Sequence, residues 1–102
     1  MLNTISTISS YEARPINFVD GMYIHRNGAR YWIKNNDYHR KNGPAIINNR
    51  SIFWVFEGKN HRLDGPAVIL FGGKKLWYYQ GTEIKCSNQE EFDKLIKLKM
   101  LW

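Results

Sequence analysis

One eight-residue phrase written twice constrains the fold of this chain more than any other feature. "HRKNGPAI" occupies residues 39–46 and "HRLDGPAV" occupies residues 61–68, 22 residues later. The tryptophans keep a similar spacing, since Trp32 and Trp54 are 22 residues apart and Trp77 follows 23 residues after Trp54. A degenerate form, "DGMYI", spans residues 20–24. Self-similarity at a fixed period is typical of repeat architectures, so we predict three units at residues 17–38, 39–60 and 61–83.

Each unit is predicted to form a β-hairpin. The strand-like runs are rich in β-branched and aromatic residues, and they cover residues 22–25, 29–34, 44–47, 51–56, 66–71 and 74–79. Asn27-Gly28, Asn48-Asn49 and Gly72-Gly73 separate the members of each pair, and these residues tolerate the positive φ of tight hairpin turns. The predicted fold is therefore mainly β, an antiparallel meander of about six strands.

Alternation along these strands predicts two apolar faces. One face carries the tryptophan column Trp32, Trp54 and Trp77, with Lys34, Phe56 and Tyr79 beside it; the other carries Tyr31, Phe53 and Leu76, then Ile33, Val55 and Tyr78. A single sheet cannot leave two apolar faces in water, so we expect at least one of them to be covered by another part of the protein or by a partner.

A C-terminal helix over residues 87–102 is the predicted cover. Ser87 is the expected N-cap with Glu90 completing a capping box, and the apolar stripe comprises Phe92, Leu95, Ile96 and Met100. We predict that residues 1–16 form an N-terminal arm or a strand. Residues 1–102 are predicted to make a single domain. A helix of this length is too short to cover both faces, which predicts a homodimer with Leu101 and Trp102 reaching across.

Net charge, cysteine content and the distribution of apolar residues limit the classes of function and location that fit this chain. The formal charge of +6 and the pI of about 9.6 favour acidic partners such as nucleic acid or an acidic protein surface. Cys86 is the only cysteine, which excludes a disulfide framework and a thiolate metal site. Residues 1–11 lack the pattern of a signal peptide, and no apolar run is long enough to span a membrane. These observations predict a cytoplasmic protein without a membrane partner.

The repeated His-Arg pairs have two interpretations. We predict structural corners, because turn-forming residues surround them; the corner residues are His39, Gly43, Pro44, His61, Gly65 and Pro66. The alternatives are contact with a ligand or catalysis, which requires a base and a partner group converging in one pocket. His25 completes a set of three histidines, but no neighbouring spacing supports a metal site. We therefore predict no enzyme, no catalytic residues, no cofactor and no metal.

The segment "WVFEGKNHRLDGPAV" (residues 54–68) and the weaker match "WIKNNDYHRKNGPAI" (residues 32–46) resemble the MORN-repeat variant of bacteriophage and bacterial proteins. The resemblance covers residues 17–83. It implies successive hairpins that serve as an interaction scaffold. It also implies, by analogy, a phage-type protein that binds and neutralises a host defence factor or toxin in the host cytoplasm.

Two classes of function follow. The first is a non-enzymatic protein-binding module, for which the candidate contacts are Trp32, Trp54, Phe56, Trp77, Tyr79 and Trp102. The second is an RNA- or DNA-binding protein, acting alone or with a protein partner, for which the candidate contacts are Arg40, Arg62, Lys94, Lys97 and Lys99. In that case the tryptophan column would be a stacking platform for bases rather than core.

Overall fold

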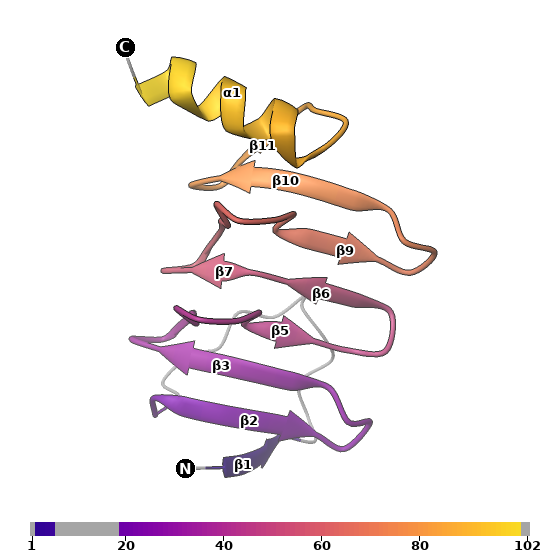
Figure 1. Cartoon of the computed structure of the whole chain (residues 1–102). Coiled ribbons are helices and arrows are strands. Elements are labelled where there is room, and N and C mark those ends of the chain that lie inside the picture. Colours follow the sequence, from indigo (N-terminus) through magenta and orange to yellow (C-terminus); the bar gives the residue numbers. More distant parts are fainter. Residues whose placement is uncertain (1, 6–18, 101–102) are drawn as a thin grey trace.

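A computed structural model describes residues 2–5 and 19–100, with side chains placed for residues 19–99. The described residues form eleven strands and one helix (Figure 1), with these bounds: β1 Leu2–Ile5, β2 Gly21–His25, β3 Arg30–Lys34, β4 Asp37–Tyr38, β5 Ile46–Ile47, β6 Ser51–Phe53, β7 Val55–Phe56, β8 Lys59–Asn60, β9 Val68–Leu70, β10 Lys75–Tyr79, β11 Thr82–Ile84 and α1 Gln89–Met100. The predicted mainly β fold with a C-terminal helix is confirmed.

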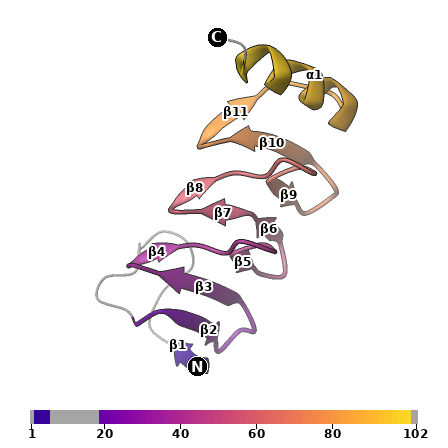
Figure 2. The same ribbon diagram turned by 60° about the vertical axis from the view of Figure 1, so that its left-hand side comes forward.

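Most strands belong to one sheet whose spatial order follows the chain, β1-β2-β3-β5-β6-β9-β10-β11, with β4 paired to β3. Neighbours in this order are antiparallel, except that β1 pairs with β2 in parallel. The short strands β4, β8 and β11 each fold back along the preceding strand, and Figure 2 shows them in a second row beside β3, β7 and β10. The molecule is thus a ladder of hairpins with α1 at its C-terminal end.

The structure divides one predicted strand. Residues 51–56 form β6 in the large sheet and β7 in a separate pair with β8, and the break falls at Trp54. The backbone N–H of Trp54 donates to the Ala67 carbonyl, and the Trp54 carbonyl accepts from His61. The same two bonds recur 22 residues earlier, where Trp32 donates to Ala45 and accepts from His39. Each tryptophan is therefore tied by its backbone to the phrase that follows it.

One turn works differently from the prediction. Gly72 and Gly73 have φ values of 91° and 92°, but neither Asn48 nor Asn49 lies in the left-handed region. The Asn48 side chain makes the turn instead, because its Oδ1 accepts from the backbone N–H groups of Arg50 and Ser51, each at 2.8 Å. A side-chain turn of this kind needs no positive φ.

The core has two parts. The larger cluster extends from β2 to β7 and contains Tyr23, Ala29, Tyr31, Ile33, Ala45, Ile46 and Val55. Burial there raises the pKa of the Tyr31 hydroxyl. The second cluster joins α1 to the last hairpin through Trp77, Phe92 and Ile96. Of the predicted apolar stripe, Phe92 and Ile96 are buried whereas Leu95 is exposed.

The helix begins later than its predicted cap. The Asn88 Oδ1 accepts from the backbone N–H of Glu91 at 2.9 Å, so Asn88 is the N-cap rather than Ser87. The Glu91 carboxylate in turn accepts from the backbone N–H of Ser87 at 2.6 Å, which makes Glu91, not Glu90, the acidic partner of the cap. No helix among residues 19–100 is long and apolar enough to cross a membrane.

Candidate functional site

The two repeated histidines hold the turns of the hairpins that follow them. The His39 Nδ1 accepts from the backbone N–H of Glu57, and the His61 Nδ1 accepts from that of Gln80, both at 2.9 Å. Glu57 and Gln80 lie in the left-handed region with φ of 49° and 48°, a conformation that costs free energy for residues with a side chain. Because Nδ1 is an acceptor, the neutral ring carries its proton on Nε2. Burial lowers the pKa of His61, which keeps that ring neutral.

The two repeated arginines are stacked on the tryptophan column. The Arg40 guanidinium carbon lies 4.0 Å from the Trp32 ring centroid, and that of Arg62 lies 3.8 Å from the Trp54 ring centroid. These distances are well inside the range of cation–π attraction. The arginines also donate from Nη1 to the carbonyls of Pro44 and Pro66, each at 3.2 Å. Each guanidinium is thus fixed between a ring and a backbone carbonyl.

Glycine is required in the phrase because of this arginine. Neither Gly43 nor Gly65 has a φ in the left-handed region, so the backbone freedom of glycine does not account for them. A Cβ at Gly65 would lie 2.6 Å from the Arg62 guanidinium carbon, and one at Gly43 would lie 2.7 Å from that of Arg40. Both distances are below any real contact, so a side chain there would displace the guanidinium.

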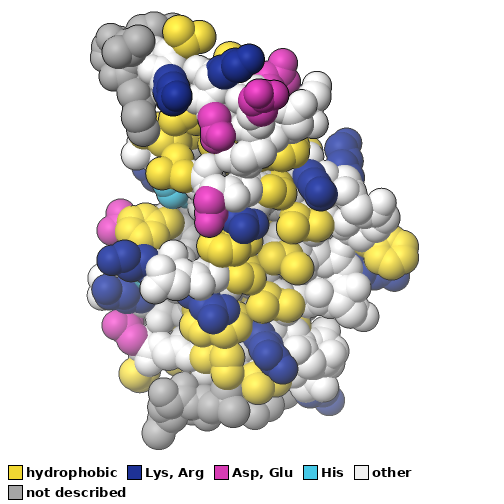
Figure 3. Space-filling view, viewed as in Figure 1, with side chains coloured by type: hydrophobic (Ala, Val, Ile, Leu, Met, Phe, Trp, Pro, Cys, Tyr) yellow, Lys and Arg dark blue, Asp and Glu magenta, His cyan; other side chains and the backbone are white. Residues whose placement is uncertain are grey.

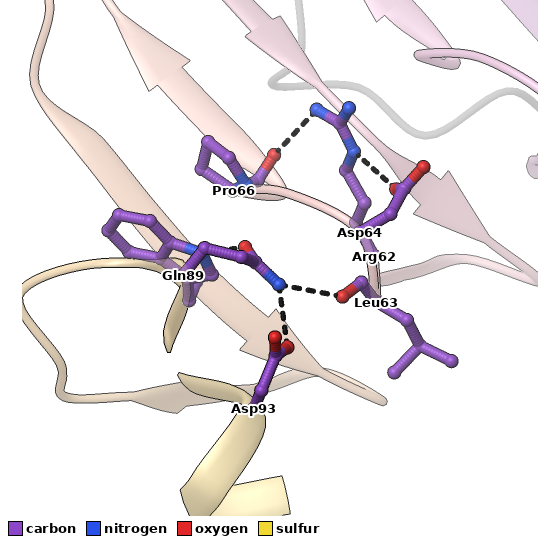
Figure 4. A network of polar contacts seen from close by, with 7 residues as sticks. Arg62, Leu63, Asp64, Pro66, Gln89 and Asp93 are labelled. Carbon is purple, nitrogen blue, oxygen red and sulfur yellow. Dashed lines mark hydrogen bonds and ion pairs between the residues drawn. The ribbon is translucent and has the colours of Figure 1, made fainter. Parts of the chain in front are cut away.

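A polar network ties the second copy of the phrase to α1 (Figure 4). The Arg62 Nε donates to Asp64 at 2.9 Å, and this hydrogen bond is the main reason that the pKa of the Asp64 carboxyl is lowered. Gln89 accepts from the Trp77 indole N–H at 2.7 Å and donates to the Leu63 carbonyl at 2.9 Å. The helix is therefore attached to the last hairpin of the sheet through the tryptophan of that hairpin.

Four rings form a second column beside the tryptophans. Their centroids are separated by 4.4 Å between His39 and Phe56, 6.4 Å between Phe56 and His61, and 5.3 Å between His61 and Tyr79. Phe56 is 37% exposed, whereas Tyr79 packs against the cluster under α1. Phe56 is therefore the ring of this column that is most open to a partner.

A groove of about 700 Å³ opens beside Phe56. Its apolar wall comes from Trp54, Phe56 and Leu63, and its charged rim carries four basic and two acidic side chains, Arg40, Lys41, Lys59, Arg62, Glu57 and Asp64. Figure 3 shows hydrophobic side chains in a column along the sheet with Lys and Arg side chains among them. Leu63 is 49% exposed and lines the same groove as Phe56, so the two exposed apolar side chains lie in one place.

The other predicted site residues lie elsewhere. Trp77 is 7% exposed and packs against Phe92 and Ile96, so its ring belongs to the core beneath α1. Trp32 is half-buried against the larger cluster. Lys94, Lys97 and Lys99 are exposed on α1, on a different element from Arg40 and Arg62. Trp102 lies outside the described residues.

No metal site is formed within residues 19–99, where no three His, Cys, Asp or Glu side chains come together. The Nδ1 of His25 accepts a long bond of 3.3 Å from the backbone N–H of Asn27 in its own turn. The Cys86 thiol has a raised pKa because it is partly buried and lies near Glu91 and Glu83, so the thiolate is disfavoured at neutral pH.

Sequence reasoning missed the groove residues Lys41, Glu57, Lys59, Leu63 and Gln80. The signal that finds them is the difference between successive units. Phe56, Glu57 and Lys59 stand where Lys34, Asn35 and Asp37 stand 22 residues earlier, whereas the histidine, arginine and tryptophan are kept.

The same part of the earlier unit has only a smaller hollow of about 260 Å³, lined by Lys34, Asn35, Asp37, His39 and Glu57. The tryptophan, histidine and arginine that the units share hold the hairpins together and also line part of the groove, whereas Phe56 and Lys59, which differ between units, distinguish this groove from the earlier hollow. Comparison with protein-family models, with characterised proteins and with solved structures finds no match for this chain.

Proposed function

We propose that this protein is a non-enzymatic interaction protein that binds another protein through the groove beside Phe56. Three MORN-like hairpin repeats over residues 17–83 form its scaffold in this proposal. The observation that carries it is the exposure of Phe56 and Leu63, at 37% and 49%, on the rim of a groove bordered by basic side chains. Exposed apolar side chains gathered in one place mark interaction sites.

The engagement of the histidines and arginines argues against catalysis. A general base needs a free ring nitrogen within reach of a substrate, but the Nδ1 atoms of His39 and His61 accept backbone N–H groups. The guanidinium groups of Arg40 and Arg62 are held against indole rings. The ring nitrogen of each histidine that could accept a proton is therefore already occupied, and each guanidinium is already held in the scaffold.

The resemblance to bacteriophage MORN-type repeats adds a partner class to this proposal. On that analogy the protein is phage-type and cytoplasmic, and it neutralises a host protein such as a defence factor or a toxin.

A second candidate function is binding of RNA or DNA. The net charge of +6 and the exposed lysines at 94, 97 and 99 of α1 favour it. Binding of this kind would weaken steeply with salt, because phosphate contacts release counterions.

Affinity capture from a nuclease-treated bacterial lysate tests the proposal. Wild-type protein and a Phe56→Ala/Leu63→Ala variant are compared, with Phe71→Ala as the control because Phe71 is 77% exposed outside the groove. We expect a protein that wild type and the control retain and the double variant loses. Retention that disappears with nuclease, or that is equal for all three proteins, contradicts the proposal.

A further inference from the structure

We infer that the groove binds an acidic peptide segment that carries an aromatic or aliphatic anchor residue. This inference rests on the proposed function and adds the chemistry of the partner. The anchor packs on Phe56 and Leu63, while neighbouring carboxylates meet Lys41 and Lys59.

The charges of the groove select for acidic groups. Four of its side chains are basic and two are acidic. Asp64 is neutralised by Arg62, since their charged atoms are 2.9 Å apart. Lys41 and Lys59 are exposed and form no ion pair with a described residue. Two free ammonium groups against the single carboxylate of Glu57 leave a positive rim, which attracts a segment of opposite charge.

The apolar wall selects for an anchor residue. Burial of an exposed ring or leucine is the main favourable term when a peptide docks. Phe56 lies in β7, Leu63 follows the end of β8 by three residues, and both line the groove. A purely acidic chain would leave these two side chains in water and gain only weak surface ion pairs.

The rings of the groove argue against a polynucleotide. Single-strand binding relies on open aromatic faces on which bases stack. The Phe56 ring already contacts the rings of His39 and His61, at centroid distances of 4.4 Å and 6.4 Å. The Trp54 ring is covered by the Arg62 guanidinium at 3.8 Å.

The preceding unit provides an internal comparison. In that unit Lys34 stands at the position of Phe56, and Asp37 stands at the position of Lys59. The volume of the hollow there is less than half that of the groove. The same backbone with these residues offers neither an apolar wall nor the second cation. The binding chemistry is therefore specific to the groove at Phe56 and is not a property of every unit.

Fluorescence anisotropy with three labelled polymers tests the inference on the full chain. The probes are a random copolymer of glutamate and tyrosine, poly-glutamate, and poly-uridylate. We expect the copolymer to bind at least about five-fold more tightly than either of the others, because only it supplies both anchor and carboxylates. Tighter binding of poly-uridylate, or equal binding of the two acidic polymers, overturns the inference.

Two variants with matched controls locate the site. Phe56→Ala is expected to weaken copolymer binding by about five-fold or more, whereas Phe71→Ala leaves it unchanged. Lys59→Asp is expected to weaken binding of both acidic polymers by about five-fold, whereas Lys74→Asp, which makes the same charge change outside the groove, does not. Circular dichroism verifies that each variant is folded. Equal effects of a groove variant and its control overturn the inference.

This test separates the inference from the proposed function. If the copolymer does not bind but a lysate protein is still retained through Phe56 and Leu63, the protein is an interaction module for a partner of other chemistry. If the copolymer binds in the groove, the partner class stands whichever protein supplies the segment.

Discussion

Substitution of Gly65 by alanine tests the account of the repeated phrase, and its magnitude follows from the contacts of Arg62. The new Cβ would lie 2.6 Å from the guanidinium carbon and 2.9 Å from Nε and Nη1. The guanidinium must therefore shift, which disturbs its contacts with the Trp54 ring, the Pro66 carbonyl and the Asp64 carboxylate.

Each of these contacts makes a contribution of typical size to the free energy of unfolding. A cation–π contact contributes about 0.5–2 kcal/mol, and a hydrogen bond contributes a net ~0.5–1.5 kcal/mol. The Asp64 pair counts little, because the Asp64 side chain is 81% exposed. Loss of backbone entropy in the unfolded chain returns about 0.4–1 kcal/mol when glycine becomes alanine. The expected net loss in the free energy of unfolding is about 1.5 kcal/mol, within a range of about 0–3 kcal/mol set by these contributions.

A double-mutant cycle with urea unfolding isolates the cause. In an Arg62→Ala background the clash is absent, so Gly65→Ala is expected to be neutral or slightly stabilising. If Gly65→Ala costs as much without Arg62 as with it, the glycine is required by the backbone and the reasoning from Arg62 is refuted. Gly43→Ala with Arg40→Ala repeats the test at the first copy of the phrase, where the Cβ would lie 2.7 Å from the guanidinium carbon.

Three further predictions follow from the same contacts. The pKa of His61 in the folded protein is below its unfolded value of about 6.5. The contribution of His61 to the free energy of unfolding is therefore complete above that pH and decreases as the pH falls below it. His61→Asn keeps an acceptor at the same place, so the urea midpoint of this variant should decrease less than that of wild type when the pH is lowered. Gln89→Leu removes the acceptor of the Trp77 indole N–H and the donor to the Leu63 carbonyl, so thermal unfolding should show a loss of about 1–3 kcal/mol, and an unchanged midpoint would contradict the role given to this network. The raised pKa of Cys86 predicts that its reaction with a disulfide reagent at neutral pH is slower than that of a free thiol, and a rate equal to that of free cysteine would be inconsistent with that environment.

The repeated phrase and its turn residues made the hairpins predictable, and a capping pattern with an apolar stripe made the terminal helix predictable, because these are local signals. The division of residues 51–56 at Trp54 was not predictable, since it depends on bonds from Trp54 to Ala67 and His61 in the next unit. The close approach of the Arg62 guanidinium to Gly65 was not predictable either, because a sequence does not show that this side chain folds onto the Trp54 ring, which lies eight residues earlier in the chain.

The candidate site was harder to predict than the fold. The sequence drew attention to what the units share, and the shared residues are held in the scaffold by hydrogen bonds and ring contacts. Phe56 was among the predicted partner contacts, but Lys59 and Leu63 were not, because they look like ordinary loop residues until the chain brings them beside the ring. The predicted homodimer stays a prediction, which sedimentation of the full chain at several concentrations tests.

Chemical-shift mapping of the labelled protein with the glutamate–tyrosine copolymer tests the central claim most directly, because it reports every backbone amide at once. The account predicts shifts at Glu57, Lys59 and Gln80, which line the groove, and none at Lys94, Lys97 and Lys99 of α1. Shifts confined to the helix lysines, with the groove amides unmoved, would contradict it.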